Sequence, residues 1–451
     1  MNTQPIVAVI GAGPAGIFAA EELAKHNVRV MLINRDIKPG GLAEYGIFFD
    51  KFKMKDGLRN QFRKMLKNRL IEYFGNLTIG ENGNMTLPQL QALGFDGVLV
   101  AVGAQGTKWL GLPGEALKGV YHAKDIVYHY NKLPPYGKED YPIGKRVAII
   151  GAGNVMIDIA NWLINYLKVK EVVILVRRDP GSVKFSRKEI KPLLKNIDRV
   201  ALMAEIERTR PLIETFEIDA NKAFAIIRPS EKGEFPTDSN TQFRFKFLAS
   251  VKCFLGDGQS DLIGVELENN TLKRNPDGSL SASGLGTTQV LEIDTAIFAI
   301  GDRVDDQFGL PLADYEFAKN PSPNFPINDI SYEAFDPATD QVIDGVFLAG
   351  WARNASSGLV GTARKDGKNG ALAMLRFLES KTGSSTANAE TISRILLAPP
   401  SRVVSKKQWQ LLDAFELAQA QKYGTAEAKV LSNIDMLQQI HEMELASAET
   451  H

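Results

Sequence analysis

The chain has 451 residues, of which 44% are hydrophobic and 24% are charged, with 53 basic and 53 acidic side chains. This length predicts two or three domains with sizeable cores, and the zero net charge gives no general attraction to nucleic acid. No apolar run approaches the roughly 18 residues of a membrane span, and a strand-like run begins almost at once after Met1. We therefore expect a cytoplasmic protein without a membrane span or a targeting segment.

The single cysteine, Cys253, excludes several kinds of redox and metal chemistry. One thiol cannot form an intrachain disulfide, which excludes the disulfide-reducing branch of enzymes with two dinucleotide sites. It also cannot hold an iron–sulfur cluster, which needs about four ligands. Cys253 lies in a strand-like run, 245–255, and is interpreted as a small core residue. The five histidines show no HExxH spacing and no GxSxG motif occurs, so the sequence does not support a hydrolase.

The first motif with chemical meaning is VAVIGAGPAG at residues 7–16. A buried strand passes directly into Gly11, Gly13 and Gly16, and a helical pattern follows over Pro14–His26. In this context Gly11 permits a tight turn, Gly13 lets a pyrophosphate approach the backbone, and Gly16 lets helix and strand pack closely. The helix N-terminus adds free amides and partial positive charge. The motif predicts a dinucleotide site.

A second strand is predicted at Val28–Ile33, and the residue after it occupies the expected ribose-binding position. About 20 residues after the glycines this position usually carries a carboxylate, whereas this chain has Asn34, which can bond a hydroxyl but has no charge. A further glycine turn, Gly40-Gly41-Leu42, follows. The next apolar runs predict strands at Phe74–Gly80 and Phe95–Gly103, and Leu110–Glu115 is interpreted as a domain crossing.

The stretch Lys51–Arg69 is strongly basic, with eight basic residues and one acidic residue, Asp56. Its apolar side chains recur with helical spacing, so a helix is predicted. Two interpretations stay open: a solvated basic face, or a docking surface for an acidic partner. The apolar positions are Leu58, Phe62, Met65 and Leu66.

The same strand–glycine–helix device recurs 140 residues later, as VAIIGAG at Val147–Gly153. A helical pattern follows over Asn154–Leu167, and Met156 stands at the third glycine position. One interpretation is an ordinary strand-to-helix turn; the other is a second nucleotide site. Two nucleotide sites in one chain indicate an enzyme that passes reducing equivalents between two nucleotide cofactors.

The second unit carries a pair of arginines at its own ribose position. Its second predicted strand, Val172–Val176, ends in Arg177 and Arg178. Guanidinium groups here suit the 2′-phosphate of NADP, although an exposed arginine pair is the alternative. Later elements are predicted as β-like segments over Glu205–Val290 with a turn at Asn275–Gly278, core strands at Asp294–Gly301 and Gly345–Gly350, a return linker at Pro321–Asn328, and tail helices at Lys407–Lys422 and Ala426–Leu445 packed through Trp409, Leu411, Leu412 and Phe415.

Taken together, the motifs resemble the adrenodoxin reductase family: FAD-containing ferredoxin–NADP reductases on the glutathione-reductase plan. The resemblance covers nearly the whole chain, including the tail segment Val404–Glu416. Its most specific feature is Gly350-Trp351, where related flavoenzymes carry Gly-Asp. The other matching segments are Gly13–Gly16, Gly41–Gly46, Phe74–Gly80, Tyr121–Pro134, Gly151–Asp158, Arg177-Arg178 with Phe185 and Glu189, and Gly358–Val360.

The resemblance implies two sets of cofactor-binding residues. For FAD these are Gly11, Gly13, Ala15, Gly16, Asn34, Gly41, Leu42, Ile79, Trp351, Gly358, Leu359 and Val360. For NADP(H) they are Gly151, Ala152, Gly153, Asn154, Val155, Arg177, Arg178, Glu189 and Gly358. No acid or base is indispensable, and Trp351 and Gly358 are the flavin-facing candidates.

Three departures from the family pattern affect these expectations. Asn34 replaces an acidic residue, so FAD affinity is expected to be lower, and Asn34→Glu is expected to raise it. Asp50-Lys51-Phe52 replaces the family's Asp-His-Pro, and the segment 353–357 also differs. Phe52-Lys53-Met54 is closer to the small subunit of glutamate synthase, whose cysteine-rich cluster domain is missing here.

The predicted fold is therefore α/β, with two doubly wound Rossmann-like domains and a helical tail. The FAD domain comprises residues 1–107 and 327–451, and the NADP domain is inserted as residues 108–326. The nicotinamide is expected to stack on the flavin where the domains meet. The expected reaction passes a hydride from NADPH to FAD and then single electrons to an acidic ferredoxin or flavodoxin, docked through Lys51, Lys53, Arg59, Arg63 and Lys67.

Two alternatives stay open. The chain resembles, second best, an NADPH-linked electron-input subunit of a larger complex, in the manner of the glutamate synthase small subunit. A flavin-binding sensor that kept the fold is the non-enzyme alternative, and the intact set of Arg177, Arg178 and Glu189 argues against it.

Overall fold

The computed structural model describes residues 4–229, 238–356, 358–381, 388–398 and 402–449. The chain divides into two compact units. Unit 1 comprises residues 1–107, 128–138 and 302–451, and unit 2 comprises residues 108–127 and 139–301. Unit 1 resumes at Asp302, where β14 (Asp302–Arg303) pairs with β5 (Gly106–Thr107). The bounds expected for the FAD and NADP domains stay predictions.

Unit 1 is built on a seven-stranded sheet with the order β17-β18-β4-β1-β2-β3-β19. The five central strands are parallel, and the two edge strands are antiparallel to them. The strands are β1 (Ile6–Ile10), β2 (Arg29–Ile33), β3 (Ile71–Gly75), β4 (Gly97–Val100), β17 (Glu333–Asp336), β18 (Gln341–Leu348) and β19 (Val404–Ser405). Short pairs are formed by β5 with β14 and by β15 (Leu312–Ala313) with β16 (Glu316–Phe317).

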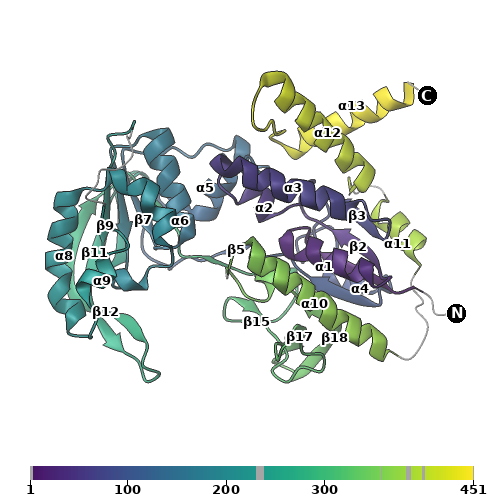
Figure 1. The fold of residues 1–451 in the computed structure, drawn as a ribbon, viewed down its shortest axis with the longest axis horizontal. Helices are drawn as coiled ribbons and strands as arrows, with labels where there is room; N and C mark the ends of the chain where they lie inside the picture. Colours follow the sequence, from purple (N-terminus) through teal and green to yellow (C-terminus); the bar gives the residue numbers. More distant parts are fainter. Residues whose placement is uncertain (1–3, 230–237, 357, 382–387, 399–401, 450–451) are drawn as a thin grey trace. The chain divides into compact units, whose positions relative to one another are not determined.

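Helices cover this sheet, and α10 runs alongside α1 (Figure 1). The helices are α1 (Pro14–Lys25), α2 (Leu42–Tyr45), α3 (Phe52–Leu66), α4 (Leu87–Gln91), α10 (Val360–Ser380), α11 (Ala389–Leu396), α12 (Lys406–Tyr423) and α13 (Asn433–Glu449). The two faces of β1 enter different cores: Val7 and Val9 pack with α1 and α10, and Ala8 and Ile10 pack on the opposite side. The strand is apolar throughout because both of its faces are buried.

Unit 2 repeats this plan with a five-stranded parallel sheet, ordered β6-β13-β7-β8-β9. A separate antiparallel sheet consists of β10, β11 and β12. The strands are β6 (Val120–His122), β7 (Arg146–Ile150), β8 (Glu171–Leu175), β9 (Gln242–Lys246), β10 (Ala249–Gly256), β11 (Leu262–Arg274), β12 (Leu280–Glu292) and β13 (Thr295–Phe298). The helices are α6 (Asn154–Asn161), α7 (Arg187–Ile190), α8 (Arg199–Glu214) and α9 (Ala220–Phe224), and α5 (Ala123–Tyr130) lies across the unit boundary.

Several predicted elements differ from the structure for identifiable reasons. The expected strand 74–80 ends at Gly75, because Asn76 adopts a left-handed conformation (φ 59°). The run 245–255 is broken in the same way at Leu248 (φ 48°), and Cys253 lies on a partly exposed strand face beside Glu266, not in the core. The first part of Glu205–Val290 is helical, since Asp198 caps α8 by accepting a hydrogen bond from the Ala201 amide.

Other predictions are confirmed. The turn at Asn275–Gly278 joins β11 to β12 and is closed by the hydrogen bond from the Gly278 amide to the Asn275 carbonyl. The predicted helix at 154–167 forms as α6 followed by a π-helical segment, Trp162–Leu167. Both tail helices form, although the second begins at Asn433 instead of Ala426 and ends at Glu449. Trp409 and Leu412 are buried, and Leu411 and Phe415 are half-buried. Ser357, the last residue of the divergent segment 353–357, lies outside the described residues.

Candidate functional site: two glycine turns

The first glycine turn, residues 11–16, connects β1 to α1 at the point where the strand order reverses. From β1 the chain moves to β2 and β3 on one side, and β4 lies on the other side. Ligands of doubly wound folds bind at such switch points, beyond the carboxyl ends of the strands. Gly11 has φ +104°, and a Cβ built on it would lie 2.4 Å from the Ala101 carbonyl oxygen of the β4 end. A Cβ on Gly16 would lie 1.8 Å from the Gly11 carbonyl oxygen. Both positions therefore require glycine for packing.

Gly13 differs from its two neighbours, because nothing in the chain requires a glycine there. It is the N-cap of α1 with an ordinary φ of −81°. A Cβ built on it would meet only the Gly41 Cα, at 4.0 Å. The space beside Gly13 therefore stays open at the N-terminus of a twelve-residue helix, where amide groups and the helix dipole favour an anion. The cradle fits the pyrophosphate of a dinucleotide.

Two further predicted segments meet the first glycine turn. The Gly40 amide donates to the Ala12 carbonyl at 2.7 Å, and a Cβ on Gly41 would lie 2.9 Å from the Gly13 Cα. This contact places Gly41, with Leu42 next in the chain, beside the open space. On the α10 side, a Cβ on Gly350 would lie 2.6 Å from the Ala15 Cβ.

Trp351 follows Gly350 in a short 3-10 turn that a buried carboxylate supports. Asp366 accepts a hydrogen bond from the Gly350 amide at 2.6 Å and pairs with the Arg353 guanidinium. Gly358 has φ +80° and precedes exposed Leu359, the N-cap of α10. The remaining FAD candidate, Ile79, packs in the core beneath the other face of the sheet.

The structure gives Asn34 a role within the chain. Its Oδ1 accepts from the Ala12 amide at 3.0 Å, and its Nδ2 donates to the carbonyls of Asp36 and Lys38 at 2.8 and 3.0 Å. The side chain is buried. A glutamate here would direct carboxylate oxygens at those carbonyls, which are acceptors themselves. We therefore no longer expect Asn34→Glu to tighten FAD binding.

The second glycine turn, residues 151–156, lies at the corresponding switch point between β7 and β13. Gly151 has φ +117°, and its Cβ would lie 2.3 Å from the Ala299 carbonyl oxygen. Gly153 has φ −107°, and a Cβ built on it would meet no atom within 4 Å. Asn154 Oδ1 is buried and has no hydrogen-bond partner in the described part of the chain. Next to it Ala152 continues the turn and Val155 is largely exposed. The open space beside Gly153 and the unsatisfied acceptor of Asn154 fit a nucleotide.

The residues expected at the 2′-phosphate lie beyond β8, beside the same turn. The Gly151 amide donates to the carbonyl of Leu175, the last residue of that strand. Arg177 is exposed, whereas Arg178 donates to the Leu280 carbonyl at 3.2 Å. Glu189 forms a capping box with Ser186 at the start of α7, a structural role that coexists with the expected ribose contact. No contact in the structure tests these assignments, so they stay predictions, as does the sharing of Gly358 between both cofactors.

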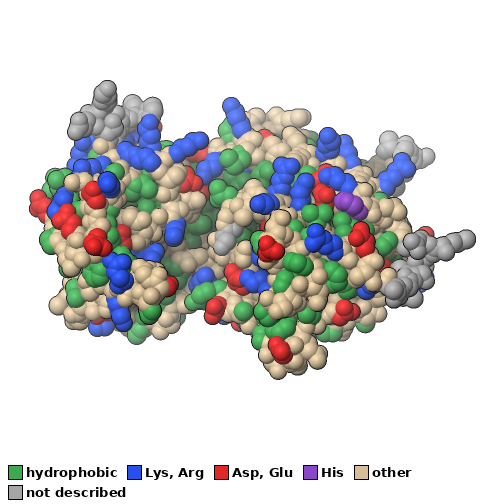
Figure 2. Space-filling view, turned by 60° about the horizontal axis from the view of Figure 1, so that its bottom comes forward, with side chains coloured by type: hydrophobic (Ala, Val, Ile, Leu, Met, Phe, Trp, Pro, Cys, Tyr) green, Lys and Arg blue, Asp and Glu red, His purple; other side chains and the backbone are tan. Residues whose placement is uncertain are grey.

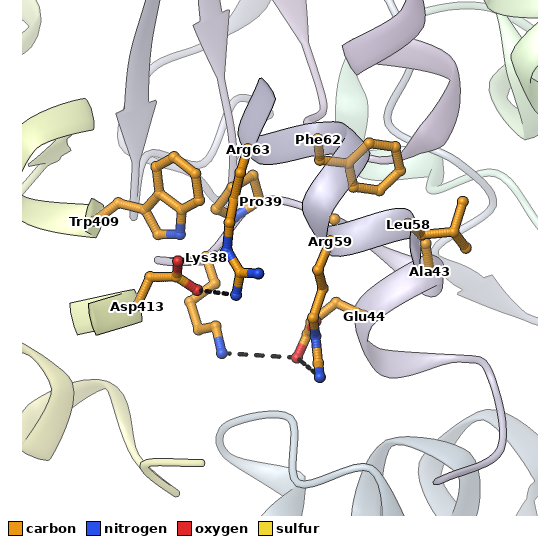
Figure 3. Close-up of a pocket in the computed structure, with 11 residues that line it drawn as sticks. Lys38, Pro39, Ala43, Glu44, Leu58, Arg59, Phe62, Arg63, Trp409 and Asp413 are labelled. Atoms are coloured by element: carbon orange, nitrogen blue, oxygen red, sulfur yellow. Dashed lines mark hydrogen bonds and ion pairs between the residues drawn. The ribbon is translucent and has the colours of Figure 1, made fainter. Parts of the chain in front are cut away.

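The basic stretch forms α3 as predicted, and Phe62, Met65 and Leu66 are buried. Several of its cations, however, are used within unit 1. Arg59 pairs with Glu44 and Glu427 at 2.6 Å each, and Arg63 pairs with Asp413 at 2.7 Å. Figure 3 shows the pairs with Glu44 and Asp413. Lys55 is fully buried, with its ammonium 3.0 Å from the Asn131 side-chain oxygen. Of the expected docking set, Lys51, Lys53 and Lys67 are exposed, whereas Arg59 and Arg63 are half-buried.

Sequence reasoning missed the partners of these cations. Asp413, the partner of Arg63, and Glu427, a partner of Arg59, belong to the C-terminal segment, 350 and 368 residues away in the chain. No local pattern in the sequence marks such pairs. In Figure 2 the basic side chains on the visible face of unit 1 are interspersed with acidic ones.

Among the described residues, no group of three or more His, Cys, Asp or Glu side chains is placed to hold a metal ion. Across those same residues, no helix has the length and apolar character needed to cross a membrane.

Comparison with known proteins finds a matching family model and similar full-length reductases. Residues 5–197 match the family described as pyridine nucleotide-disulphide oxidoreductase. The chain is 26% identical to NADPH-ferredoxin reductase FprA of Mycobacterium leprae (strain TN), with 96% of this chain and 97% of the relative covered. It is also 26% identical to the mitochondrial NADPH:adrenodoxin oxidoreductase of Homo sapiens, with 96% and 91% covered.

The fold has a solved counterpart. The structure of Mycobacterium tuberculosis FprA in complex with NADPH superimposes with a TM-score of 0.79 at 24% identity, covering 97% of this chain and all of the other. This likeness confirms the α/β fold with Rossmann-type domains and C-terminal helices. The relatives confirm the resemblance drawn from the motifs: the chain is a homologue of the adrenodoxin reductase-type reductases.

Proposed function

We propose that this chain is an FAD-dependent NADPH–ferredoxin reductase, an oxidoreductase that takes a hydride from NADPH and passes single electrons to a ferredoxin-type iron–sulfur protein. The observation that carries the proposal is the pair of open cradles, at Gly13 and Gly153, each at the switch point of its own doubly wound sheet. Two relatives that align with this chain over more than nine tenths of their own length are named NADPH-ferredoxin reductase and NADPH:adrenodoxin oxidoreductase.

In this function the residues of the chain bind and orient, and the cofactors carry the reaction. Bound FAD supplies the conversion of a two-electron hydride into single electrons. The turn at Gly13 with the loop Gly40-Gly41 holds its pyrophosphate, and the turn at Gly153 with Arg177 holds NADPH. Hydride transfer depends on orientation at about 3–3.5 Å between the reacting atoms, so no side chain is needed as an acid or base.

The test is to purify the chain and measure NADPH-dependent reduction of a ferredoxin and of a small dye. We expect a yellow protein with non-covalent FAD, active with both acceptors. A protein without flavin bands, unchanged by added FAD, contradicts the proposal. A flavoprotein that is inactive with both acceptors favours the sensor alternative, and activity only with a co-purifying subunit favours the larger complex.

The acceptor is a ferredoxin-type protein, and we propose that it or an acidic flavodoxin docks near Lys51, Lys53 and Lys67. These side chains are exposed, and the apolar side chains of Phe52 and Met54 beside them are exposed too, by 41% and 58%. Basic residues around an apolar centre suit an acidic partner, and they act mainly on the encounter rate.

A charge reversal tests this surface. Lys51→Glu with Lys53→Glu is expected to slow ferredoxin reduction severalfold at about 0.05 M salt and to spare the dye, with the difference shrinking as salt rises. Lys222→Glu, an exposed lysine of unit 2, is the control. Equal rates for both variants contradict docking at this surface. The cytoplasmic location stays a prediction, because the human relative is mitochondrial.

A further inference from the structure

The C-terminal segment contacts the loop beside the first glycine turn through one buried lysine. Lys429 lies between α12 and α13, and its side chain is 2% exposed. Its ammonium lies 3.1 Å from the Glu44 carboxylate and donates to the carbonyls of Asn131 and Glu44 at 2.8 and 3.3 Å. It also lies 4.7 Å from the centre of the Tyr45 ring. These contacts compensate the desolvation of the charge.

Glu44 is the centre of this cluster. It is a buried carboxylate of α2, and Lys38 and Arg59 contact it in addition to Lys429, as Figure 3 shows for the first two. Burial alone would raise the pKa of Glu44, but Lys429, Lys38 and Arg59 bring it well below its usual range. Glu44 is therefore a carboxylate held by three cations, and one of them comes from the tail.

The same loop forms the wall beside the open cradle. Gly40 and Gly41 precede Glu44, and the Gly40 amide bonds to the Ala12 carbonyl while Gly41 faces Gly13. A Cβ on Gly40 would lie 2.9 Å from the Glu44 Cβ, so the loop and α2 are packed as one body. A continuous chain of contacts thus leads from Lys429 through Glu44 to Gly13.

The cluster is not a ligand site of its own. The cavity among Lys38, Glu44, Arg59, Arg63 and Trp409 has a volume of about 20 Å³, room for about one water molecule (Figure 3). Its side chains point toward one another, and each charge already has a partner in the chain. Its consequence must therefore be sought in the loop that it holds.

We propose that Lys429 is a positioning residue for FAD: it fixes α2 and the loop Gly40-Gly41 against the first glycine turn, and so slows FAD release. The inference rests on the proposed function, since it assigns the first glycine turn to FAD. The tail segment, which has no part in the glycine motifs, thereby becomes part of the cofactor-binding structure.

The experiment compares the FAD dissociation rates of the purified holoproteins carrying Lys429→Met and Lys429→Arg. We expect Lys429→Met to release FAD about tenfold faster, because removing one partner of a buried pair destabilises the local arrangement. Lys429→Arg keeps the charge and is expected to restore part of the retention. The control is Lys422→Met, which removes an exposed lysine from the same tail, and it is expected to stay within about twofold of wild type.

Two measurements separate positioning from general stability. The affinity for NADPH, whose predicted contacts lie in unit 2 apart from Gly358, is expected to stay unchanged in Lys429→Met, whereas the visible circular dichroism of the bound flavin changes. If Lys429→Met does not fold, Glu44→Gln, which keeps the shape of the side chain, replaces it and is expected to speed FAD release likewise.

The inference is overturned if Lys429→Met lowers the melting temperature but releases FAD at the wild-type rate. It is also overturned if Lys422→Met has the same effect on release as Lys429→Met. Failure of the proposed function is a separate result, because it appears as a wild-type protein that neither contains FAD nor takes it up.

Discussion

The two glycine turns use the same backbone device but differ in what supports them. In both, the carbonyl of the middle alanine accepts a hydrogen bond from a later loop: Gly40 donates to Ala12 at 2.7 Å, and Lys184 donates to Ala152 at 2.8 Å. In unit 1 the supporting loop is backed by buried charges from the tail. In unit 2 Lys184 is exposed. A cofactor that stays bound is favoured by a rigidly held loop beside its glycine turn. A cofactor that exchanges at every turnover is compatible with a more exposed loop.

The turns also differ at their third position. Gly16 of unit 1 packs on the Gly11 carbonyl, while Met156 of unit 2 is a fully buried side chain. Helix α6 therefore contacts its sheet through a side chain where α1 contacts its sheet through backbone. The third position of the first turn has the tighter steric requirement. A substitution there is therefore expected to have the largest effect on stability.

Gly16→Ala is expected to prevent unit 1 from folding normally. The new Cβ would lie 1.8 Å from a backbone oxygen that cannot move without the turn itself, so we expect a loss of roughly 4 kcal/mol or more. Thermal unfolding and flavin content are the measurements. Gly57→Ala, on α3, serves as the control because its Cβ meets no atom within 4 Å and it belongs to neither predicted cofactor set. Wild-type stability of Gly16→Ala would contradict the close approach of α1 to β1.

The arginine pair of unit 2 is expected to determine the choice between NADPH and NADH. Charge-assisted bonds to a 2′-phosphate contribute about 1.5–3 kcal/mol each in favourable cases, less when exposed. Arg177→Ala with Arg178→Ala should weaken NADPH by about tenfold to a few hundredfold and leave NADH nearly unchanged. Because Arg178 already donates to the Leu280 carbonyl, the single change Arg177→Ala should account for most of the loss. Titration of both cofactors is the measurement, and equal losses would refute the assignment.

The buried cations of unit 1 predict a pH dependence of stability. Burial lowers the pKa of Lys55 to about 8; the nearby Lys429 and Arg59 act in the same direction, and Glu427 and Glu44 oppose them. The folded state therefore binds fewer protons than the unfolded state between pH 8 and 10.5, and stability rises with pH across this window. From pH 7.5 to 9.5 the contribution is about 2 kcal/mol, at 1.36 kcal/mol per pH unit above 8.

Lys55→Met should remove this contribution. Urea unfolding of the flavin-free protein at the two pH values measures it, with Lys53→Met, an exposed lysine of the same helix, as the control. If Lys55→Met keeps the wild-type pH dependence, another buried group, such as Lys429, is responsible.

Some features of the glycine turns and their surroundings could be predicted from the sequence, and others could not. The spacing of the glycines predicted the turn and the packing reasons for Gly11 and Gly16, because a local strand–turn–helix geometry determines them, while the role of Gly13 toward a pyrophosphate stays a prediction. The role of Asn34 was not predictable, since its partners Asp36 and Lys38 lie in a loop whose path no pattern indicates. The same holds for Arg59 and Arg63, whose charge suggested docking but whose partners come from the distant tail. The helical spacing of Leu202, Ile206 and Ile213, which are buried in α8, is the signal in the sequence that indicates this helix.

We proposed that the space beside Gly13 holds FAD and that the space beside Gly153 holds NADP(H). Both residues have backbone angles that alanine adopts without strain, and neither Cβ would meet an atom of the chain closer than 4.0 Å. The most direct measurement is the binding of both cofactors by Gly13→Ala and Gly153→Ala. We predict that both variants fold with wild-type melting temperatures as apoproteins, that Gly13→Ala loses FAD affinity alone, and that Gly153→Ala loses NADPH affinity alone. Unchanged binding of both cofactors in both variants would contradict the account.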